Sequence, residues 1–197
     1  GEGLQHADGH SPLIAATNPA VVHYDPATAF EVAHIVQDGL RRMYGSTEQH
    51  PHGEDVIYYL TVYNEPIVQP AEPENLDVAG LLKGIYHFAA PPEGYDDGTP
   101  RVQLMASGVG LPWVLKARDL LQQDWGIAAD VWSVTSWNEL ARDAVAAERW
   151  NLLHPTEPAR RAFVSERLEG APGPVVAVSD YMRAVPLQIA KWVPQAY

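Results

Sequence analysis

A strand-to-helix junction stands in the stretch Pro19-Ala20-Val21-Val22-His23-Tyr24-Asp25-Pro26. The short apolar run at residues 19–24 fits a buried strand. Asp25 is a candidate helix cap because its carboxylate can accept the free N–H groups of a first turn, and Pro26 suits the first helical position, where it has no hydrogen bond to lose. The junction therefore predicts a strand that is followed at once by a helix.

The helix that begins here has one apolar stripe, which is typical of a helix packed on a core. The stripe consists of Ala29, Val32, Ala33, Val36, Leu40 and Met43. Arg41 and Arg42 suit the negative end of the helix dipole, and Gly45 ends the helix. After a polar loop, residues 55–63 are nearly all β-branched or aromatic, so we expect a second strand that is covered on both faces. This order of elements predicts a parallel pair with a right-handed crossover.

Residues 65–100 contain six prolines around one short apolar segment. Prolines at this density favour a stiff, extended connection between two domains. We place the domain boundary near Pro73. Within the connection, residues 84–88 fit an edge strand.

The second half repeats the alternation of strand and helix. We expect strands at residues 102–106, 129–134 and 174–179, and helices at residues 111–125, 137–149, 160–168 and 184–192. Ser136 and Glu139 match a capping box, in which each side chain satisfies one free N–H group at a helix start. Strands separated by helices predict an α/β fold with an open, mostly parallel sheet.

Composition excludes several classes of partner. The 25 Asp and Glu residues against 13 Lys and Arg residues give a net charge of −12, which repels nucleic-acid phosphates and anionic lipid surfaces. The absence of cysteine removes disulfides, thiolate nucleophiles and cysteine zinc sites. No apolar run approaches the roughly 20 residues that a membrane span needs. We therefore expect a globular protein without nucleic-acid or membrane partners and, because no signal peptide is visible, a cytoplasmic location.

The candidate site is the first stretch of the chain, Gly1-Glu2-Gly3-Leu4-Gln5-His6-Ala7-Asp8-Gly9-His10. Its three glycines and lack of apolar periodicity predict a loop, and loops of this composition tend to carry functional residues. Four of its side chains can bind or move protons, namely Glu2, His6, Asp8 and His10. Because the chain starts inside this loop without a methionine, we expect it to be a piece of a longer protein.

Two roles stay open for these histidines on the residues alone. A metal site is disfavoured, because His6 and His10 lie on a loop with no third ligand nearby. A structural hydrogen bond is the common role of a loop histidine, whereas acidic neighbours and an ordinary pKa of about 6.5 suit proton transfer.

Other motifs favour no specific chemistry. Gly108-Val109-Gly110 is interpreted as an ordinary strand-to-helix turn, because Trp113 stands where a dinucleotide fingerprint has its third glycine. Neither a Gly-x-Ser-x-Gly elbow nor a lysine-bearing phosphate loop is present, so hydrolase and nucleotidase functions lack support. The residues alone predict an α/β protein with a histidine-bearing loop.

Long stretches of the chain are similar to one enzyme family. They are residues 1–11, Tyr24-Asp25-Pro26-Ala27, Arg42-Met43-Tyr44-Gly45, Tyr63-Asn64-Glu65, Lys83-Gly84-Ile85-Tyr86, residues 130–136, Glu139-Leu140-Ala141-Arg142-Asp143, Glu148-Arg149-Trp150-Asn151 and Ser179-Asp180-Tyr181-Met182. They occur in the family's order over almost the whole chain. On these residues the chain resembles the homodimeric E1 components of pyruvate dehydrogenase complexes. Trp132, Trp137 and the stretch Val62-Tyr63-Asn64-Glu65-Pro66 resemble the actinobacterial branch.

The resemblance implies a thiamine-diphosphate enzyme of transketolase-like architecture, which decarboxylates pyruvate oxidatively and acetylates a lipoyl group. Residues 1–73 would be the end of the pyrimidine-binding domain, residues 74–100 a proline-rich linker, and residues 101–197 an incomplete transketolase-like C-terminal domain. The family's Mg²⁺ and diphosphate site and its activating glutamate lie outside this sequence. We therefore expect no cofactor or metal ligands here and no activity from this piece alone.

The resemblance also implies partners and site residues. The partners are pyruvate, the lipoyl domain of the dihydrolipoyl acyltransferase and a second E1 subunit. His6 occupies the position of the family histidine that faces the substrate, so we expect it to hydrogen-bond or transfer a proton to the pyruvate-derived group. Glu2, Asp8 and His10 are secondary candidates that orient the loop.

Two alternatives share much of this evidence. The first is a transketolase or another 2-oxo acid decarboxylase of the same architecture, which differs in the product made from pyruvate and a lipoyl acceptor. The second is a non-catalytic dimerisation or docking module, which differs in failing to bind the cofactor.

Overall fold

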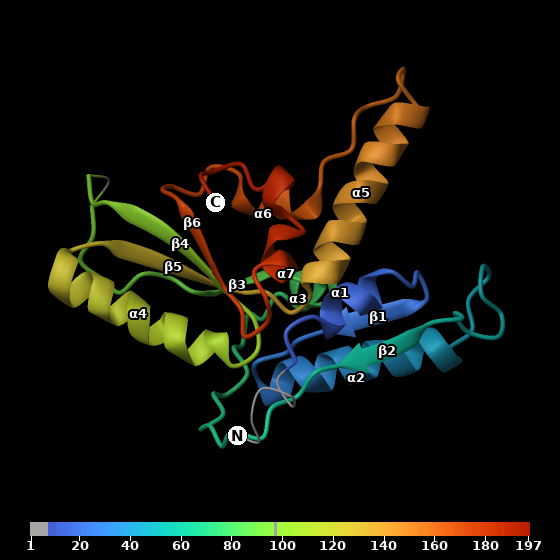
Figure 1. Cartoon of the computed structure of the whole chain (residues 1–197), viewed down its shortest axis with the longest axis horizontal. Coiled ribbons are helices and arrows are strands. Elements are labelled where there is room, and N and C mark those ends of the chain that lie inside the picture. Colours follow the sequence, from blue (N-terminus) through green and yellow to red (C-terminus); the bar gives the residue numbers. More distant parts are fainter. Residues whose placement is uncertain (1–7, 97) are drawn as a thin grey trace.

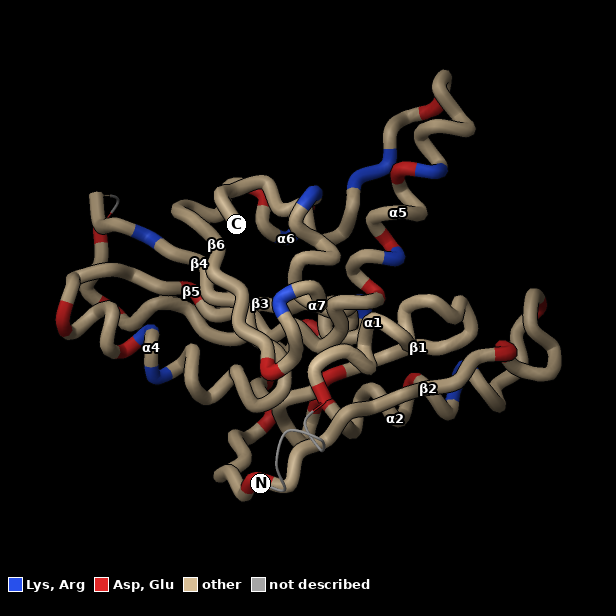
Figure 2. The backbone as a smooth tube through the Cα atoms, viewed as in Figure 1, with Lys and Arg blue, Asp and Glu red and all other residues tan. Residues whose placement is uncertain are grey.

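The computed structural model describes residues 8–96 and 98–197. A two-stranded sheet lies before residue 74, in the part here called the N-terminal half. A four-stranded sheet lies after it, in the part here called the C-terminal half, and the two halves are in contact (Figure 1). Acidic residues are distributed over both halves rather than gathered on one surface (Figure 2). The net charge of −12 is therefore a property of the whole surface and not of one patch.

Strand β1 (Val21–Tyr24), helix α2 (Ala29–Tyr44) and strand β2 (Ile57–Leu60) form the predicted strand-helix-strand unit. The two strands pair in parallel, with Val21 opposite Ile57. Tyr24 lies in a small core that α2 shares with this sheet. The predicted parallel pair is confirmed.

The start of α2 differs from the prediction. The helix is capped by Thr28, whose side chain accepts a hydrogen bond from Glu31 N while the Glu31 carboxylate accepts one from Thr28 N. Asp25 is no cap; it lies buried and accepts hydrogen bonds from Thr61 and Tyr63. Thr28 and Glu31 take over the capping role because together they satisfy two N–H groups.

The predicted apolar stripe of α2 does not face the core of this structure. Val36 is 43% exposed and Leu40 is 53% exposed, whereas Glu31 and Asp38 are buried. The buried carboxylate of Asp38 accepts hydrogen bonds from Tyr58 Oη and Arg41, each at 2.5 Å. Hydropathy points to the wrong face because these buried acidic side chains are also paired with groups outside the helix, such as Tyr58 with Asp38.

The second strand is also shorter and more exposed than predicted. β2 spans Ile57–Leu60 instead of residues 55–63, and Ile57 is 61% exposed. β2 pairs with one strand only, so it is an edge strand in the described part of the chain. Its apolar composition therefore predicted the strand but overestimated how far the strand is covered.

The larger sheet has the strand order β3-β5-β4-β6. Its strands are β3 (Tyr86–Ala89), β5 (Ala128–Ser133), β4 (Arg101–Ala106) and β6 (Val175–Val178). β3 runs antiparallel at one edge, and the other three strands are parallel. Both the mostly parallel sheet and the edge strand near residues 84–88 are confirmed.

Helices cover both faces of this sheet (Figure 1). Helix α4 (Gly110–Trp125) lies on one face, and α6 (Phe163–Leu168) and α7 (Ala184–Leu187) lie on the other. Helix α5 (Trp137–Leu153) begins where the two halves meet, a region here called the joint, and projects outward from it. Among the described residues, further helical elements are α1 (Ser11–Ala16), α3 (Val78–Lys83) and the 3-10 helix η2 (Ala190–Trp192).

Several helix limits differ from the predictions. α5 continues to Leu153, and the helix predicted at residues 184–192 is divided into α7 and η2. α1 was not predicted because six residues that include Pro12 carry too little periodicity. The Ser136 cap of α5 is confirmed, since its hydroxyl accepts a hydrogen bond from Glu139 N at 3.0 Å. The predicted return bond from Ser136 N to the Glu139 carboxylate is not formed, because Ser136 N donates to Gly84 O and Glu139 pairs with Arg142.

Buried hydrogen bonds join the two halves. Asp25 N donates to Thr135 O at 2.8 Å, and the Ser136 hydroxyl donates to His23 O at 2.5 Å. These bonds connect the end of β1 to the segment between β5 and α5. Because buried polar groups must be paired, they fix the relative position of the halves.

Among the side chains at this contact, the Glu31 carboxylate accepts the most hydrogen bonds. One carboxylate oxygen accepts hydrogen bonds from Tyr86 Oη at 2.7 Å and Ser133 Oγ at 2.6 Å, both in the larger sheet. The other oxygen accepts bonds from Ala27 N at 2.5 Å and Thr28 N at 3.0 Å. A single fully buried side chain therefore caps α2 and binds the second half of the molecule.

Candidate functional site

The predicted site is described only in part. His6 and Glu2 lie outside the described residues, whereas Asp8 and His10 lie within them. Asp8 Oδ1 accepts hydrogen bonds from His10 N at 3.0 Å and from Ser11 N at 2.9 Å. These bonds close a turn of residues 8–10, here called the Asp8 turn, directly before α1. The side chain of His10 makes no cap hydrogen bond to α1.

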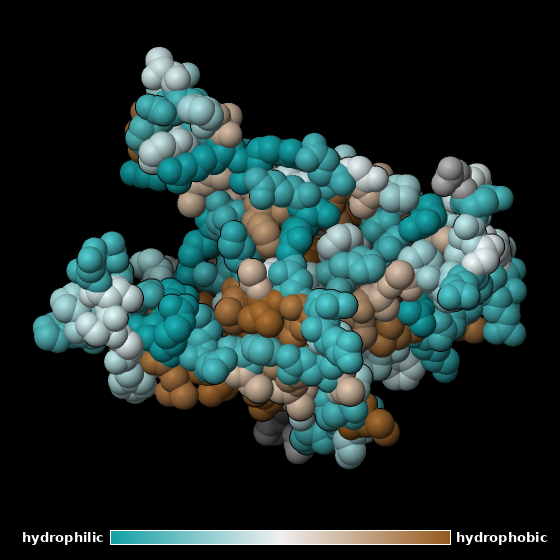
Figure 3. All heavy atoms as spheres, turned by 180° about the vertical axis from the view of Figure 1, so that it is seen from behind, coloured by the Kyte–Doolittle hydropathy of each residue, from teal (hydrophilic) through white to brown (hydrophobic). Residues whose placement is uncertain are grey.

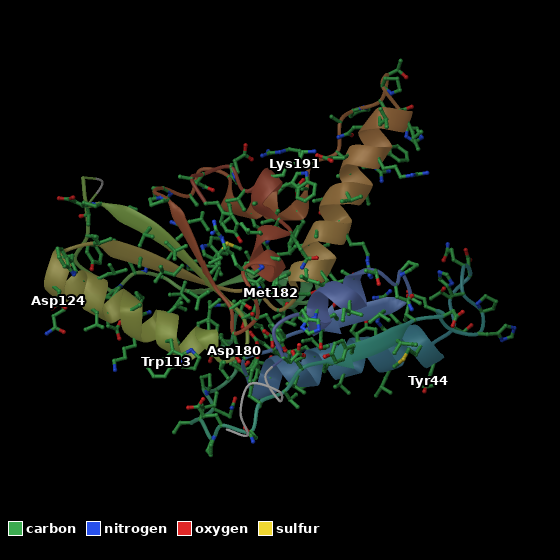
Figure 4. The ribbon with its side chains drawn as sticks, viewed as in Figure 1. Tyr44, Trp113, Asp124, Asp180, Met182 and Lys191 are labelled. Atoms are coloured by element: carbon green, nitrogen blue, oxygen red, sulfur yellow. The ribbon has the colours of Figure 1, made fainter. Side chains whose placement is uncertain are left out.

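The Asp8 turn is fixed to the C-terminal half. Gly9 O accepts a hydrogen bond from Met182 N at 2.8 Å. Figure 4 shows Met182 and Asp180 near the middle of the molecule, where the halves meet. Burial disfavours the charged form of Asp8, but hydrogen bonds from Ser11 and His10 outweigh it and hold the pKa of Asp8 below its usual value. Asp8 is therefore a stable anion that organises the turn.

A polar face of the small sheet lies opposite α2. It is formed by His23 and Asp25 on the β1 side and by Tyr59, Thr61 and Tyr63 on the β2 side. Thr61 and Tyr63 donate to Asp25 Oδ1 at 2.7 and 2.8 Å. Because these groups lie toward the carboxyl ends of parallel strands, they occupy the edge where open α/β sheets usually bind ligands.

Asp25 is the buried centre of this edge, with only 1% of its surface exposed. Burial raises its pKa, although hydrogen bonds from Ser107, Thr61 and Tyr63 act in the opposite direction. Thr61 and Tyr63 hold Oδ1 of the carboxylate, and Oδ2 is buried without a partner among the described residues. This position suits Asp25 to a structural role at the edge of a site.

The turn between β4 and α4 packs against the same group. Gly108 has φ +49°, and a Cβ at this position would lie 2.6 Å from the Tyr63 ring and 2.8 Å from Asp25 Oδ1. Gly108 N also donates to Asp25 O at 3.1 Å. The strand-to-helix turn interpreted from Gly108-Val109-Gly110 is present, and glycine is required at its first position for close packing.

His23 is buried beside the Asp8 turn. It is 1% exposed, and its ring centroid lies 4.9 Å from that of Tyr59. Burial lowers the pKa of His23 to about 4, against the opposing attraction of the Asp8 carboxylate. The imidazole is therefore neutral near pH 7.

We expect the free energy of unfolding to fall as the pH drops from about 6.5 toward 4. Folded His23 resists protonation down to a pKa of about 4, whereas in the unfolded chain it binds a proton below about 6.5. The unfolded state therefore binds more protons in this window and gains stability from acid. Urea unfolding at pH 7 and pH 5 measures the change. The His23→Phe variant should lose less stability between these pH values, and an equal loss in both proteins would contradict the assignment.

Sequence reasoning missed the roles of His23 and Asp25. It placed the histidine in a predicted strand without a role of its own and interpreted the aspartate as a helix cap. A usable signal was the alternation of polar side chains at His23 and Asp25 and again at Tyr59, Thr61 and Tyr63, which places each set on one face of a strand.

The described residues around Tyr63 and Gly108 offer neither a cluster of metal ligands nor a pocket of the usual ligand size. No three His, Asp or Glu side chains in residues 8–96 and 98–197 gather closely enough to hold a metal ion. The pocket beside Tyr63 and Gly108 has a volume of about 150 Å³, below the roughly 300 Å³ at which ligand pockets usually start. Within the same residues, no helix has the length and hydropathy that crossing a membrane requires.

Two family profiles match the chain. Residues 84–196 match the family described as transketolase-like TK C-terminal domain. Residues 1–70 match the family described as pyruvate dehydrogenase E1 component middle domain.

Longer relatives are named pyruvate dehydrogenase E1 component. The chain is 58% identical over 197 residues to the pyruvate dehydrogenase E1 component of Mycolicibacterium smegmatis and 57% identical to that of Mycobacterium tuberculosis, each match covering 100% of this chain and 20% of the relative. The Escherichia coli K12 protein of the same name is 44% identical, with 98% of this chain and 20% of the relative covered. The chain thus spans about a fifth of the length of these curated relatives.

Solved structures agree on the fold. Transketolase from Leishmania mexicana superposes with a TM-score of 0.53 at 15% identity, over 98% of this chain and 23% of that chain. A Pichia stipitis transketolase variant gives a TM-score of 0.53 at 15% identity, over 89% of this chain and 20% of that chain. The chain therefore belongs to the transketolase-like C-terminal domain family, and over its whole length it is similar to proteins named pyruvate dehydrogenase E1 component.

Proposed function

We propose that this chain works as part of an E1 component, which decarboxylates pyruvate oxidatively and acetylates the lipoyl group of a dihydrolipoyl acyltransferase. The observation that carries the proposal is the 58% identity over all 197 residues to a protein named pyruvate dehydrogenase E1 component. Identity to solved transketolases is 15%, so the sequence favours E1 over a transketolase with the same fold.

Thiamine diphosphate and Mg²⁺ are the proposed cofactors of the longer protein, and the ligands for both belong to other parts of it. The division into a pyrimidine-binding part at residues 1–73, a linker at residues 74–100 and a C-terminal domain at residues 101–197 is supported by family matches at residues 1–70 and 84–196. A cytoplasmic location completes the proposal.

His6 is the proposed acid/base group, with Glu2, Asp8 and His10 as residues that orient its loop. Two contacts support a defined position for the end of that loop, because Asp8 binds its own turn and Gly9 O accepts the N–H of Met182. In this role the imidazole of His6 would exchange a proton with the pyruvate-derived group.

A second E1 subunit is the proposed protein partner of α2. Val36, Leu40 and Tyr44 follow one another at intervals of one turn and are 43%, 53% and 78% exposed. Figure 4 shows Tyr44 at the end of α2 far from the joint, and Figure 3 shows apolar residues exposed among hydrophilic ones on the rear face. An apolar helix stripe of this kind is usually covered by another protein surface.

We expect His6→Ala to lower turnover by about 10²-fold or more in the longer protein, because a positioned acid/base group contributes on this scale. The assay combines pyruvate, thiamine diphosphate, Mg²⁺ and a lipoyl-domain acceptor and measures both carbon dioxide and acetylated lipoyl groups. His50→Ala is the control, since His50 is exposed in a loop. Turnover of His6→Ala within twofold of wild type would refute the role of His6.

This assay and a second one with sugar phosphates as substrates separate the alternatives. Carbon dioxide without acetyl-lipoyl product would indicate another 2-oxo acid decarboxylase. Ketol transfer between sugar phosphates would indicate a transketolase. Absence of all three activities in the wild-type protein would leave a dimerisation or docking module.

A further inference from the structure

His23 is a buried histidine without a visible hydrogen-bonding partner. Neither Nδ1 nor Nε2 has a partner among the described residues, although both atoms are buried. By contrast, His34, His87 and His154 each place a ring nitrogen within 3.0 Å of an oxygen. Buried polar groups are nearly always paired because an unpaired one loses its bonds to water and gains nothing in return, so the environment of His23 calls for a partner.

The surroundings of the ring show where this partner lies. His23 alternates with Val22 and Tyr24, which pack toward α2, so its side chain is on the opposite face. On that face lie Tyr59 and helix α1, which packs against β1. The Asp8 turn leads directly into α1.

The Asp8 turn has hydrogen-bonding capacity to offer. Asp8 uses Oδ1 for the N–H groups of His10 and Ser11. The turn directly precedes α1, the helix that packs against β1, and the charge of Asp8 favours the protonated form of His23. A neutral imidazole has one N–H donor and one acceptor nitrogen, so it can bind a water molecule that also binds this carboxylate.

We propose that His23 is a positioning residue for the Asp8 turn: one ring nitrogen hydrogen-bonds the turn across a buried water and thereby fixes the distance between the turn and β1. The inference rests on the proposed function, in which this turn continues the segment that carries His6. His23 acts through the turn and does not touch the reacting group. A displacement of about 1 Å at such a segment can cost as much as 10²-fold in rate.

The test compares three substitutions in the longer protein with its cofactors. His23→Phe keeps an aromatic ring against Tyr59 but removes both nitrogens. His23→Asn and His23→Gln each restore a donor and an acceptor near the position of one ring nitrogen. His87→Phe is the matched control, because His87 also packs on an aromatic ring, that of Trp132 at 5.0 Å, but lies in the larger sheet.

We expect His23→Phe to lower kcat by about 10-fold or more, with a smaller change in KM. At least one of the two amide variants should recover kcat to within about threefold of wild type, and His87→Phe should keep wild-type kcat. The Tm of His23→Phe should stay within about 2 °C of wild type at pH 7, because a buried ring replaces a buried ring. Loss of kcat in all three His23 variants together with a large fall in Tm would show a merely structural role and overturn the proposal.

Hydrogen–deuterium exchange gives a readout that does not depend on activity. We expect His23→Phe to speed exchange about fivefold or more at the N–H groups of His10, Ser11 and Met182, which hold the turn, and His87→Phe to leave it unchanged. Wild-type inactivity toward pyruvate would refute the proposed function, while this exchange still decides the role of His23. Unchanged exchange, or a kcat of His23→Phe above half that of wild type, would refute the positioning role.

Discussion

Glu31→Ala is expected to lower the free energy of unfolding by about 3 kcal/mol or more, because four donors lose their acceptor at once. The hydroxyl groups of Tyr86 and Ser133 and the N–H groups of Ala27 and Thr28 all donate to this carboxylate. The change removes the capping box of α2 and a link between the halves together. Urea unfolding monitored by circular dichroism measures the effect.

Two further variants check the cause. Glu48→Ala removes an exposed glutamate and should change stability by less than about 0.5 kcal/mol. Tyr86→Phe removes one of the four donors and should cost about 1 kcal/mol. If Glu31→Ala were no more destabilising than Tyr86→Phe, the shared carboxylate would not be the main link between the halves.

Gly108→Ala is expected to destabilise the protein by about 2–4 kcal/mol, the range in which backbone strain and overpacking act together. The new Cβ would lie within 2.6–2.8 Å of the Tyr63 ring, the Tyr63 hydroxyl and Asp25 Oδ1. The hydrogen bonds from Thr61 and Tyr63 to Asp25 oppose the shift that the new Cβ would require. Thermal unfolding measures the loss.

Gly126→Ala is the matched control. Gly126 has φ +63°, similar to the +49° of Gly108, but no atom lies within 4 Å of the position that a Cβ would take there. Gly126→Ala should therefore cost only about 1 kcal/mol, the free energy of holding a residue with a Cβ in the left-handed conformation. Equal losses for the two variants would mean that backbone conformation, and not contact with Tyr63 and Asp25, explains the requirement for Gly108.

The predictions from sequence succeeded where the signal is local. The apolar runs near Val22 and Leu104 and the cap at Ser136 each depend on neighbours in the chain, and the structure has strands and a helix start at these positions. The order of these elements was then enough to predict parallel pairing, because crossover geometry limits the alternatives.

The predictions failed where a side chain is satisfied by distant residues. Glu31 is buried because Tyr86 and Ser133 donate to it, and Ser133 stands 102 positions further along the chain. Asp25 leaves its expected capping role because Thr61 and Tyr63 bind it from the next strand. No hydropathy pattern within a helix window contains such partners, so the buried face of α2 could not be read from α2 alone.

The candidate site likewise has one part that the sequence predicts and one part that only the structure reveals. The motif that contains His6 is recognisable as sequence, but its assignment stays a prediction because His6 lies outside the described residues. The structure instead singles out His23, which lies in an apolar run with nothing in the sequence to distinguish it. Its importance depends on burial without a partner, which only three-dimensional packing reveals.

The joint around Glu31 has a consequence for motion. A hinge rotation of the two halves would have to separate Glu31 from Tyr86 and Ser133 and leave these buried groups without partners, and each such group costs about 1–3 kcal/mol. Interfaces between domains are commonly loose enough to allow rigid-body opening. Here buried hydrogen bonds join the two halves, and these bonds would break if the halves moved apart. Any opening or closing in this part of the chain must therefore come from local loop movement, with the two halves turning as one body.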